Sequence, residues 1–331
     1  MKSIIVFNLL FFIFTMTLFT SPTLTYAQTS CQWKFSKTGN YANQKIDEIS
    51  GIAHSNNGRW RFLVNDSGSA PLIYVQDQIT SQIYPFNVPV KSFTDVEDLS
   101  VGRCQSHLFK NEAEDILPDE ECLYIADIGD NRKKRSNINL YVLRVNKIEE
   151  HILKNEKKYG HYVPTVKMHY PQSAKNAEGF SINPLRPELG HILSKTTKGE
   201  AELFTVNLNL WEESKDLALE KIAALPIVDK LKSKKIKTSD TSITSMDIAP
   251  QGNKILFLTY GTAFELKINM ETAANWNEEE WKDWFQQSTF EPIKIENLEQ
   301  QESIAYGKNE NEFFYTTESK KKAPLVQANC I

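Results

Sequence analysis

The chain has 331 residues, of which 40% are hydrophobic, and its formal net charge is −4 at pH 7. Its 38 Lys and Arg residues are outnumbered by 42 Asp and Glu residues and form no large basic region. These numbers exclude a nucleic acid or an anionic membrane surface as the main partner. A chain of this length can bury a large core as one β-domain or as two smaller domains.

The first residues predict a signal peptide. Lys2 supplies a positive charge, residues 4–20 form an uncharged apolar run, and residues 25–27 place small residues where a signal peptidase cuts. The apolar run is short for a membrane span, which favours a cleaved signal over an anchor. We expect removal of residues 1–27 and export of residues 28–331 to the periplasm or the extracellular medium, with no membrane span in the mature chain.

The four cysteines are Cys31, Cys104, Cys122 and Cys330. An even number in an exported chain predicts two disulfide bonds, for which three pairings are possible. Cys104 and Cys122 flank a polar, acidic loop between two strand-like runs, a spacing that favours a local bond. Cys31 and Cys330 would then tie together the two ends of the domain. No Cys-x-x-Cys spacing indicates a zinc site.

A repeat organises the rest of the chain. Five times an acidic residue is followed by a small or apolar step, a turn and a hydrophobic strand. The acidic residues are 49, 81, 69 and 55 residues apart, and a four-stranded propeller blade takes about 40 to 50 residues. The sequence therefore predicts an all-β fold, a five-bladed β-propeller with short helical insertions. Six blades, with a degenerate blade inside the longest interval, remain the alternative. The five acidic residues are Glu48, Glu97, Glu178, Asp247 and Glu302.

The elements within each unit follow from short runs of β-branched and aromatic residues. We expect second strands at 61–66, 122–127, 191–195, 254–260 and 312–318, third strands at 72–75, 140–145, 202–206 and 263–268, and fourth strands at 163–170 and 292–295. Helices are predicted within the insertions 140–158, 211–225 and 275–287. Asn277 is the expected N-cap of the last helix, whose tryptophans are expected to pack against the propeller rim.

The two ends of the chain complement each other. Residues 32–36 form a strand without a unit of its own, while the last unit lacks room for four strands before Ile331. In propellers an N-terminal strand often completes the final blade and removes the open sheet edges. We expect this closure here, and a bond between Cys31 and Cys330 would secure it.

Several of these motifs together resemble a family of secreted bacterial β-propeller proteins of unsettled activity. The similarity rests on 48–53 (EISGIA), 64–68 (VNDSG), 95–99 (DVEDL), 126–132 (ADIGDNR) and 176–180 (NAEGF). The chain is more distantly similar to phytase-like and gluconolactonase-like propellers, and this likeness implies a divalent metal in the central channel. The gluconolactonase pattern mixes carboxylates with asparagines around the metal. This sequence departs from that pattern, so the activity is not implied.

The acidic residues of the repeat suggest a metal site. On equivalent inner strands, Glu48, Glu97, Glu178, Asp247 and Glu302 would converge on the channel axis, where like charges raise each other's pKa. Ca²⁺ or another divalent cation would relieve the repulsion, because Ca²⁺ prefers about six to eight oxygen ligands. Protonation would relieve it too. As a third alternative, each carboxylate accepts backbone N–H bonds from the next blade and acts as a structural latch.

Loops after the second strands add polar residues at one channel mouth. Glycines there let the backbone fold its oxygens around one point, although the same residues are also ordinary turn formers. The equivalent place in the third unit is Lys195, and in the fifth unit it lies near Glu318. The candidate ligand residues at this mouth are Asn65, Asp66, Asp127, Asp130, Asn131 and Lys195.

Two functions remain open. No serine-hydrolase elbow, P-loop, zinc-protease motif or dinucleotide fingerprint occurs, so no organic cofactor is expected. The first function is a monomeric propeller that binds a small molecule, glycan, protein or envelope component at the channel mouth, with or without a divalent cation. The alternative is a metal-dependent hydrolase of a phosphoester or lactone, with Asp66, Asp127 or Asp130 holding the metal. The basic run 132–135 is a solvated loop or recruits a phosphate-bearing substrate.

Overall fold

The structure, a computed structural model, describes residues 31–41, 46, 48–66, 68, 70–112, 114–213, 215–296, 298–319 and 323–331. The predicted signal peptide, residues 1–27, lies outside the described residues. Among the helices of these segments, none has the length and apolar character needed to cross a membrane.

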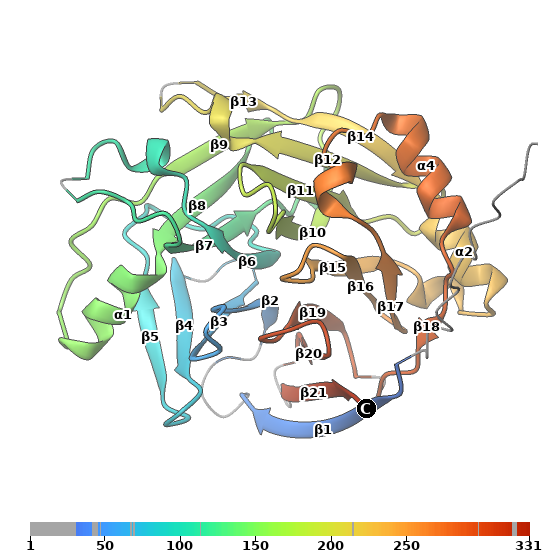
Figure 1. The fold of residues 1–331 in the computed structure, drawn as a ribbon, viewed down its shortest axis with the longest axis horizontal. Coiled ribbons are helices and arrows are strands. Elements are labelled where there is room, and N and C mark those ends of the chain that lie inside the picture. Colours follow the sequence, from blue (N-terminus) through green and yellow to red (C-terminus); the bar gives the residue numbers. More distant parts are fainter. Residues whose placement is uncertain are drawn as a thin grey trace, which may run out of the picture. The chain divides into compact units, whose positions relative to one another are not determined.

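Residues 33–331 form a five-bladed β-propeller, as predicted. Five sheets are arranged radially, and one strand of each lies at the centre of the ring (Figure 1). The alternative with six blades is wrong, because the longest interval holds blade 2 with long loops. The inner strands are β2 (Ile49–His54), β6 (Asp98–Arg103), β10 (Ala177–Ile182), β15 (Ile243–Ile248) and β19 (Gln301–Tyr306).

Each blade continues outward from its inner strand by antiparallel pairing. Blade 1 adds β3 (Trp60–Asn65), β4 (Leu72–Asp77) and β5 (Ile83–Asn87), and blade 2 adds β7 (Glu121–Asp127), β8 (Ile138–Arg144) and β9 (Thr165–His169). Blade 3 adds β11 (Leu189–Ser194), β12 (Ala201–Asn207) and β14 (Glu220–Leu225), and blade 4 adds β16 (Lys254–Thr259), β17 (Ala263–Lys267) and β18 (Pro292–Ile293). The short β13 (Leu217–Ala218) pairs with β9 in parallel.

The N-terminal strand closes the ring. In blade 5, β19 and β20 (Glu312–Thr317) are followed by β21 (Pro324–Cys330), and β1 (Trp33–Asn40) pairs with β21 in antiparallel register. The two strands, one from each end of the chain, lie side by side in Figure 1. The predicted bond between Cys104 and Cys122 is present, and Cys31 and Cys330 are disulfide-bonded as well. Cysteines paired in this way are typical of an oxidising compartment.

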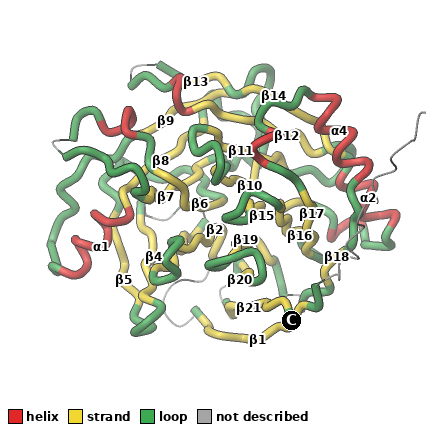
Figure 2. The backbone as a smooth tube through the Cα atoms, in the orientation of Figure 1, coloured by secondary structure: helices red, strands yellow, loops and turns green. Residues whose placement is uncertain are grey.

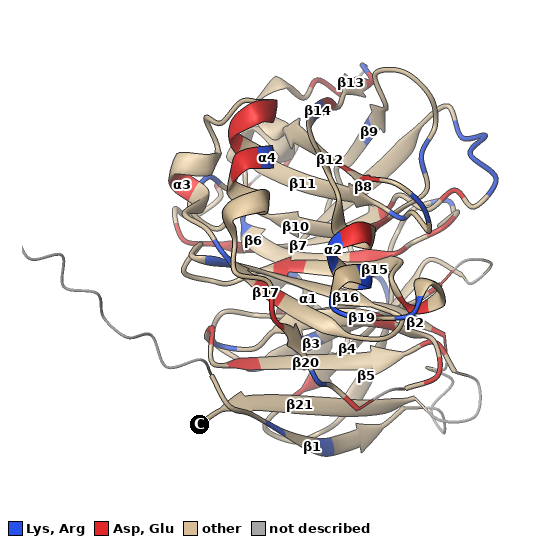
Figure 3. Ribbon diagram, turned by 90° about the vertical axis from the view of Figure 1, so that its right-hand side faces the viewer, with Lys and Arg blue, Asp and Glu red and all other residues tan. Residues whose placement is uncertain are grey.

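The described residues form four helices, of which the three labelled in Figure 2 lie at the periphery of the ring of strands. They are α1 (Val145–Leu153), α2 (Ile227–Ser233), α3 (Met270–Ala273) and α4 (Glu278–Gln287), with short 3₁₀ turns at Ser106–Phe109, Leu208–Leu210 and Thr238–Asp240. In Figure 3, the charged residues of α4 are mostly acidic, whereas α2 carries charges of both signs.

Two predicted helices are confirmed, α1 within 140–158 and α4 within 275–287, and a third is wrong. Asn277 caps α4 with a full capping box, and Trp281 and Phe285 are buried against blades 3 and 4, as predicted. Residues 211–225 were expected to form a helix but contain β13 and β14. Leu217 and Leu219 are both buried, which is the alternation of a strand rather than the period of a helix.

The hydrophobic core lies between neighbouring blades. One cluster joins Phe62 and Val64 of blade 1 to Leu123 and Leu143 of blade 2, and further clusters fill the other spaces between blades. Each blade is therefore held by the faces of its two neighbours.

Polar side chains hold the inner strands together at the axis. Asp98 is fully buried, and its carboxylate accepts backbone N–H bonds from Leu99, from Phe180 at 3.0 Å in blade 3, and from Met246 at 3.4 Å in blade 4. Ser245 Oγ donates to the same carboxylate at 3.1 Å. The Asp98 side chain thus connects three blades. It is a structural latch of the kind expected of the repeated acidic residues, but Asp98 is not one of the five that the repeat selects.

We predict that Asp98→Ala lowers the free energy of unfolding by about 3–5 kcal/mol, because it leaves several buried donors without an acceptor. Asp98→Asn keeps one acceptor oxygen and should cost about 1–2 kcal/mol. Chemical denaturation followed by tryptophan fluorescence measures both, with the exposed Asp119→Asn as the control. A loss below about 1 kcal/mol for Asp98→Ala would show that water or a rearranged strand replaces this carboxylate.

Candidate functional site

A group of carboxylates lies at the channel mouth formed by the N-terminal ends of the inner strands. Asp66 follows β3 directly, while Asp95 and Glu97 come just before β6. One ligand oxygen from each of these three residues lies within 4.8 Å of the other two. We call Asp66, Asp95 and Glu97 the acidic cluster.

The backbone at Gly129 leaves room for this cluster. A Cβ atom placed on Gly129 would lie 2.1 Å from Glu97 Oε1 and 2.6 Å from Asp95 Oδ2. Any other residue would therefore push at least one carboxylate away. Gly129 also donates its N–H to the carbonyl of Asp95 at 3.0 Å, which fixes the loop against the cluster. This glycine belongs to the DIGDNR segment, the most specific motif of the sequence.

A second polar group lies beside the acidic cluster and contains unlike residues. Lys195 Nζ lies 3.0 Å from Glu178 Oε1 and donates to the Tyr260 hydroxyl at 2.7 Å. Tyr260 in turn donates to Glu302 Oε1 at 2.7 Å. Glu318 shares a hydrogen bond with Glu302. Blades 3, 4 and 5 thus bring one lysine, one tyrosine and three carboxyl groups to the same mouth.

The carboxyl groups hold their protons more tightly than free ones. Burial and the Asp66 carboxylate raise the pKa of Asp95 to about 6, and burial together with Glu178 holds the pKa of Glu97 well above its ordinary value. Burial raises the pKa of Glu178 to about 7, although Lys195 opposes the rise, and burial and Glu302 raise the pKa of Glu318 to about 8. Burial is the largest cause in each case and neighbouring carboxylates add to it, so a cation bound at this mouth would lower these pKa values.

The loop residues Asp127 and Asp130 support the site from behind. Asp127 is fully buried, accepts the N–H groups of Thr94 and Asp95 at 2.9 and 3.0 Å, and pairs with Arg135 Nη2 at 2.8 Å. Its oxygens are thereby used to hold the Asp95 loop in place. Asp130 accepts the N–H of Arg135 at 2.6 Å in the same way.

Asn131 and Asn65 also lie beside the mouth. Asn176 donates to Asn131 Oδ1 at 3.2 Å and to Glu178 Oε1 at 2.9 Å, so Asn131 is linked to the second polar group. Asn65 is the last residue of β3 and precedes Asp66. Of the six candidate ligand residues, Asp66 and Lys195 present their side chains among the clustered groups, whereas Asp127 and Asp130 are engaged by their own loops.

Three of the five acids of the repeat occupy equivalent positions. The pairing register shifts at the same place in four inner strands, and the shifted residues include Glu178 and Glu302. Glu97 holds the corresponding position before β6, while Ser50 and Thr244 hold it in blades 1 and 4. Both hydroxyls donate to a carbonyl of the next blade.

Glu48 and Asp247 depart from the expected ring. Glu48 pairs with Glu318 through an isolated β-bridge at the edge of the acidic mouth. Asp247 lies near the C-terminal end of β15, toward the opposite mouth, because the repeat of blade 4 places Thr244 where blades 2, 3 and 5 have their acid. Matching by residue type alone misaligned these two units.

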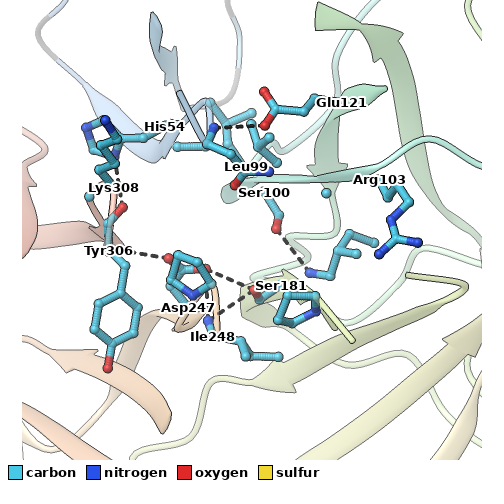
Figure 4. A pocket seen from close by; sticks show the side chains of 18 of the residues that line it. His54, Leu99, Ser100, Arg103, Glu121, Ser181, Asp247, Ile248, Tyr306 and Lys308 are labelled. Carbon is cyan, nitrogen blue, oxygen red and sulfur yellow. Dashed lines mark hydrogen bonds between the residues drawn. The ribbon is translucent and has the colours of Figure 1, made fainter. Parts of the chain in front are cut away.

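The opposite mouth contains a cavity of about 290 Å³ lined by the C-terminal ends of the inner strands. Figure 4 shows Asp247 in its wall, between Ser181 and Tyr306. Asp247 accepts a hydrogen bond from Ser181 Oγ at 2.9 Å and from the N–H of Tyr306 at 2.8 Å, so it joins blades 3, 4 and 5. Asp247 therefore fits the third alternative for the acidic residues, a structural latch that accepts a backbone N–H bond from the next blade.

Sequence reasoning missed several residues of the acidic mouth. Asp95 and Asn176 belong to quoted motifs but were not selected, Arg135 was considered only as part of the basic run 132–135, and Tyr260 carried no signal of its own. Their roles arise from contacts between blades, which a search for repeats does not reveal.

Comparisons with known proteins identify no family. No protein-family model and no curated protein match the chain. Among solved structures, the chain is similar to a luciferin-regenerating enzyme with 9% identity and a TM-score of 0.46, over 91% of this chain and 96% of that one. It is also similar to the Swd1 β-propeller domain of Myceliophteria thermophila, with 11% identity and a TM-score of 0.39 over 86% and 65% of the two chains. Nidogen, solved in complex with laminin, has 9% identity and a TM-score of 0.42 over 82% and 73%. No residue role is transferred from these proteins.

We predict that Asp247→Asn flattens the dependence of stability on pH. Burial raises the pKa of Asp247 to about 6 in the folded protein, above its ordinary value of 3.8. The folded state therefore binds this proton more tightly, and the stability due to Asp247 decreases as the pH rises from about 4 to about 6. The difference in unfolding free energy between wild type and variant should shrink by about 2 kcal/mol over this range. A difference that stays constant from pH 4 to 7 in denaturation experiments would contradict the assignment.

Proposed function

We propose that the protein is a binding propeller that holds a divalent cation in the acidic cluster and contacts its ligand at the same channel mouth. The observation that carries this proposal is the approach of Asp66, Asp95 and Glu97 to within 4.8 Å of one another, against a glycine that leaves them space. Like charges this close, with pKa values raised by burial, favour a bound cation as their neutralising partner.

The donor set supports a hard cation. All three candidate ligands are carboxylates, and oxygen donors suit Ca²⁺, Mg²⁺ or Mn²⁺ rather than zinc or copper. Asp127 would not bind the ion itself but would hold Asp95 in position by accepting its N–H, as residues that support metal ligands commonly do. Ca²⁺ is the favoured ion, since its flexible coordination tolerates ligands from separate loops and an open side for a ligand's oxygens. The resemblance of the motifs to phytase-like propellers supports the same class of ion.

The ligand that suits this mouth has oxygen atoms to offer the cation and an anionic group to offer Lys195. Lys195 is the cation of the second polar group, where it already pairs with Glu178. A small molecule, glycan or protein loop with carboxylate or phosphate groups meets both requirements.

We expect Ca²⁺ to raise the free energy of unfolding of the purified, chelator-treated protein by about 2.7 kcal/mol at a concentration one hundred times its Kd. Glu97→Gln, Asp95→Asn and Gly129→Ala should each weaken binding at least tenfold, the last by displacing both carboxylates. Isothermal titration calorimetry measures the Kd, with Mg²⁺, Mn²⁺ and Zn²⁺ as competing ions. Asp119→Asn, an exposed acid at the opposite mouth, is the control. Equal affinity in all four variants would rule out the acidic cluster as the binding site.

One observation favours a hydrolase as the second candidate. The chain of contacts through Lys195, Tyr260 and Glu302 places unlike side chains next to the acidic cluster, which a purely structural ring does not require. With a metal that polarises a phosphoester or lactone, the Lys195 ammonium would stabilise developing negative charge.

If the protein is a hydrolase, Lys195→Met should lower kcat for bis(p-nitrophenyl) phosphate or a δ-lactone about 100-fold or more while Ca²⁺ still binds. Tyr260→Phe, which keeps the ring beside Lys195 and removes the hydroxyl, should have a smaller effect. Absorbance assays with the cation-loaded protein measure the turnover. If the wild type turns over neither substrate, the binding function stands alone.

A further inference from the structure

A second polar cleft lies between blades 1 and 5, away from the acidic cluster. Its volume is about 420 Å³, and it shares His54, Gly307 and Lys308 with the wall of the opposite mouth. None of its lining residues belongs to the acidic cluster. We call it the Arg61 cleft; its polar lining includes Arg61, Gln76, Gln78, Lys308, Glu312 and Gln327.

Arg61 is buried in the wall of this cleft, with 4% of its surface exposed. Its Nε donates to His54 Nε2 at 2.8 Å, and its Nη1 donates to Gln76 Oε1 at 2.9 Å and to the Tyr41 hydroxyl at 3.2 Å. His54 Nδ1 lies 3.0 Å from the carbonyl of Tyr306, to which it donates, so its Nε2 is the acceptor for Arg61. All of these partners are uncharged. Gln76 does not ionise, burial raises the pKa of the Tyr41 hydroxyl, and burial lowers the pKa of His54 well below its usual value.

The remaining nitrogen, Nη2, has no protein partner among the described residues. No carboxylate of those residues lies within 4.0 Å of the Arg61 guanidinium, although Glu312 lies on the same cleft. Arg144, which is buried to a similar extent, is by contrast paired with Glu120. Glu312 attracts the Arg61 guanidinium only from a longer distance, so the burial of this charge is offset less well than that of a directly paired arginine.

The cleft is built to hold the guanidinium in one orientation. The Phe314 ring lies under it, 4.4 Å from Cζ to the ring centroid, and three hydrogen bonds fix its plane. An arginine ordered in advance, with one edge left over, is a typical recognition element for an anion. Exposed Lys308 adds a second positive charge at the rim.

The charges of the lining identify the kind of anion. Arg61 and Lys308 are positive, Glu312 is negative and His54 is neutral, so the cleft carries a small positive excess that suits a monoanion. Glu312 would repel the second charge of a phosphate dianion. The amides of Gln78, Gln327 and Asn57 offer hydrogen bonds to hydroxyl groups.

We propose that the Arg61 cleft binds a small polyhydroxylated carboxylate of the size of an acidic monosaccharide, with the carboxylate on Arg61 Nη2 and the hydroxyl groups on the surrounding amides. A volume of about 420 Å³ lies within the usual range for small-molecule sites. This site is separate from the cation site proposed above and does not depend on it.

The test compares sodium D-glucuronate with D-glucose, two probes that differ at a single carboxylate. Calorimetric or NMR titration of the purified protein is done in EDTA, so that a cation in the acidic cluster plays no part. Glucuronate should bind at least tenfold more tightly than glucose. Glucose binding equally well, or no binding of glucuronate at tens of millimolar, would overturn the proposal. Tighter binding of inorganic phosphate than of glucuronate would also overturn it.

Variants locate the binding on this cleft. Arg61→Gln should weaken glucuronate binding about tenfold or more, and Lys308→Ala about threefold. Glu312→Gln removes the negative charge while keeping the side-chain shape, so it should tighten binding. Exposed Lys198, on a hairpin of blade 3, gives the control Lys198→Ala, which should leave the Kd unchanged.

The signs of these effects distinguish the proposal from a general loss of folding. If Arg61→Gln does not fold, Lys308→Ala and Glu312→Gln still shift the Kd in opposite directions. Unchanged affinity in both of these variants would place the carboxylate elsewhere and refute the site.

Discussion

The fold depends on how five inner strands satisfy their polar groups around a narrow axis. Asp98 reaches from blade 2 to the backbone of blades 3 and 4, and Ser245 adds bonds to Asp98 and to blade 5. An unsatisfied buried N–H costs about 1–3 kcal/mol, so side chains of the inner strands are committed to these bonds. Because the contacts cross the axis in its middle, the two mouths are separate chemical environments.

The register of the inner strands decides what each mouth contains. A one-residue shift near the start of four inner strands turns one side chain per blade toward the N-terminal mouth, as β-bulges commonly do. Glu178 and Glu302 occupy this position, whereas Ser50 and Thr244 use it to bond the next blade. The acidic mouth is therefore asymmetric: at this position three blades carry a carboxylate, and the other two carry a hydroxyl that bonds the next blade. That asymmetry lets one side differ chemically from the other, as a binding site requires.

Local patterns were enough to predict the blades, the closing strand and the capped helix α4, because each is written in consecutive residues. The segment 211–225 has the sequence pattern of an amphipathic helix, but it contains strands β13 and β14. The alternating burial of Leu217 and Leu219 fits a strand. The candidate site was found in part. Glu97, Glu178 and Asp66 lie in recognisable motifs, whereas Asp247 was matched by type and lies at the other mouth. Tyr260 and Arg61 depend on contacts between blades, for which the sequence holds no local signal.

Two places in the molecule depart from what stability alone favours. At the N-terminal mouth, Asp95, Glu97 and Glu178 lie close together and their pKa values are raised. In the cleft between blades 1 and 5, no carboxylate of the described residues lies within 4.0 Å of the buried Arg61, and Glu312 acts on it only from farther away. The hydrophobic clusters between the blades supply stability that these polar sites do not need to add. The cluster has an excess of negative charge, and the cleft has an excess of positive charge. Neutral hydrogen bonds hold Arg61 in place, and Asp127, itself paired with Arg135, holds the Asp95 loop, so at both places the opposite charge is best supplied by a bound partner.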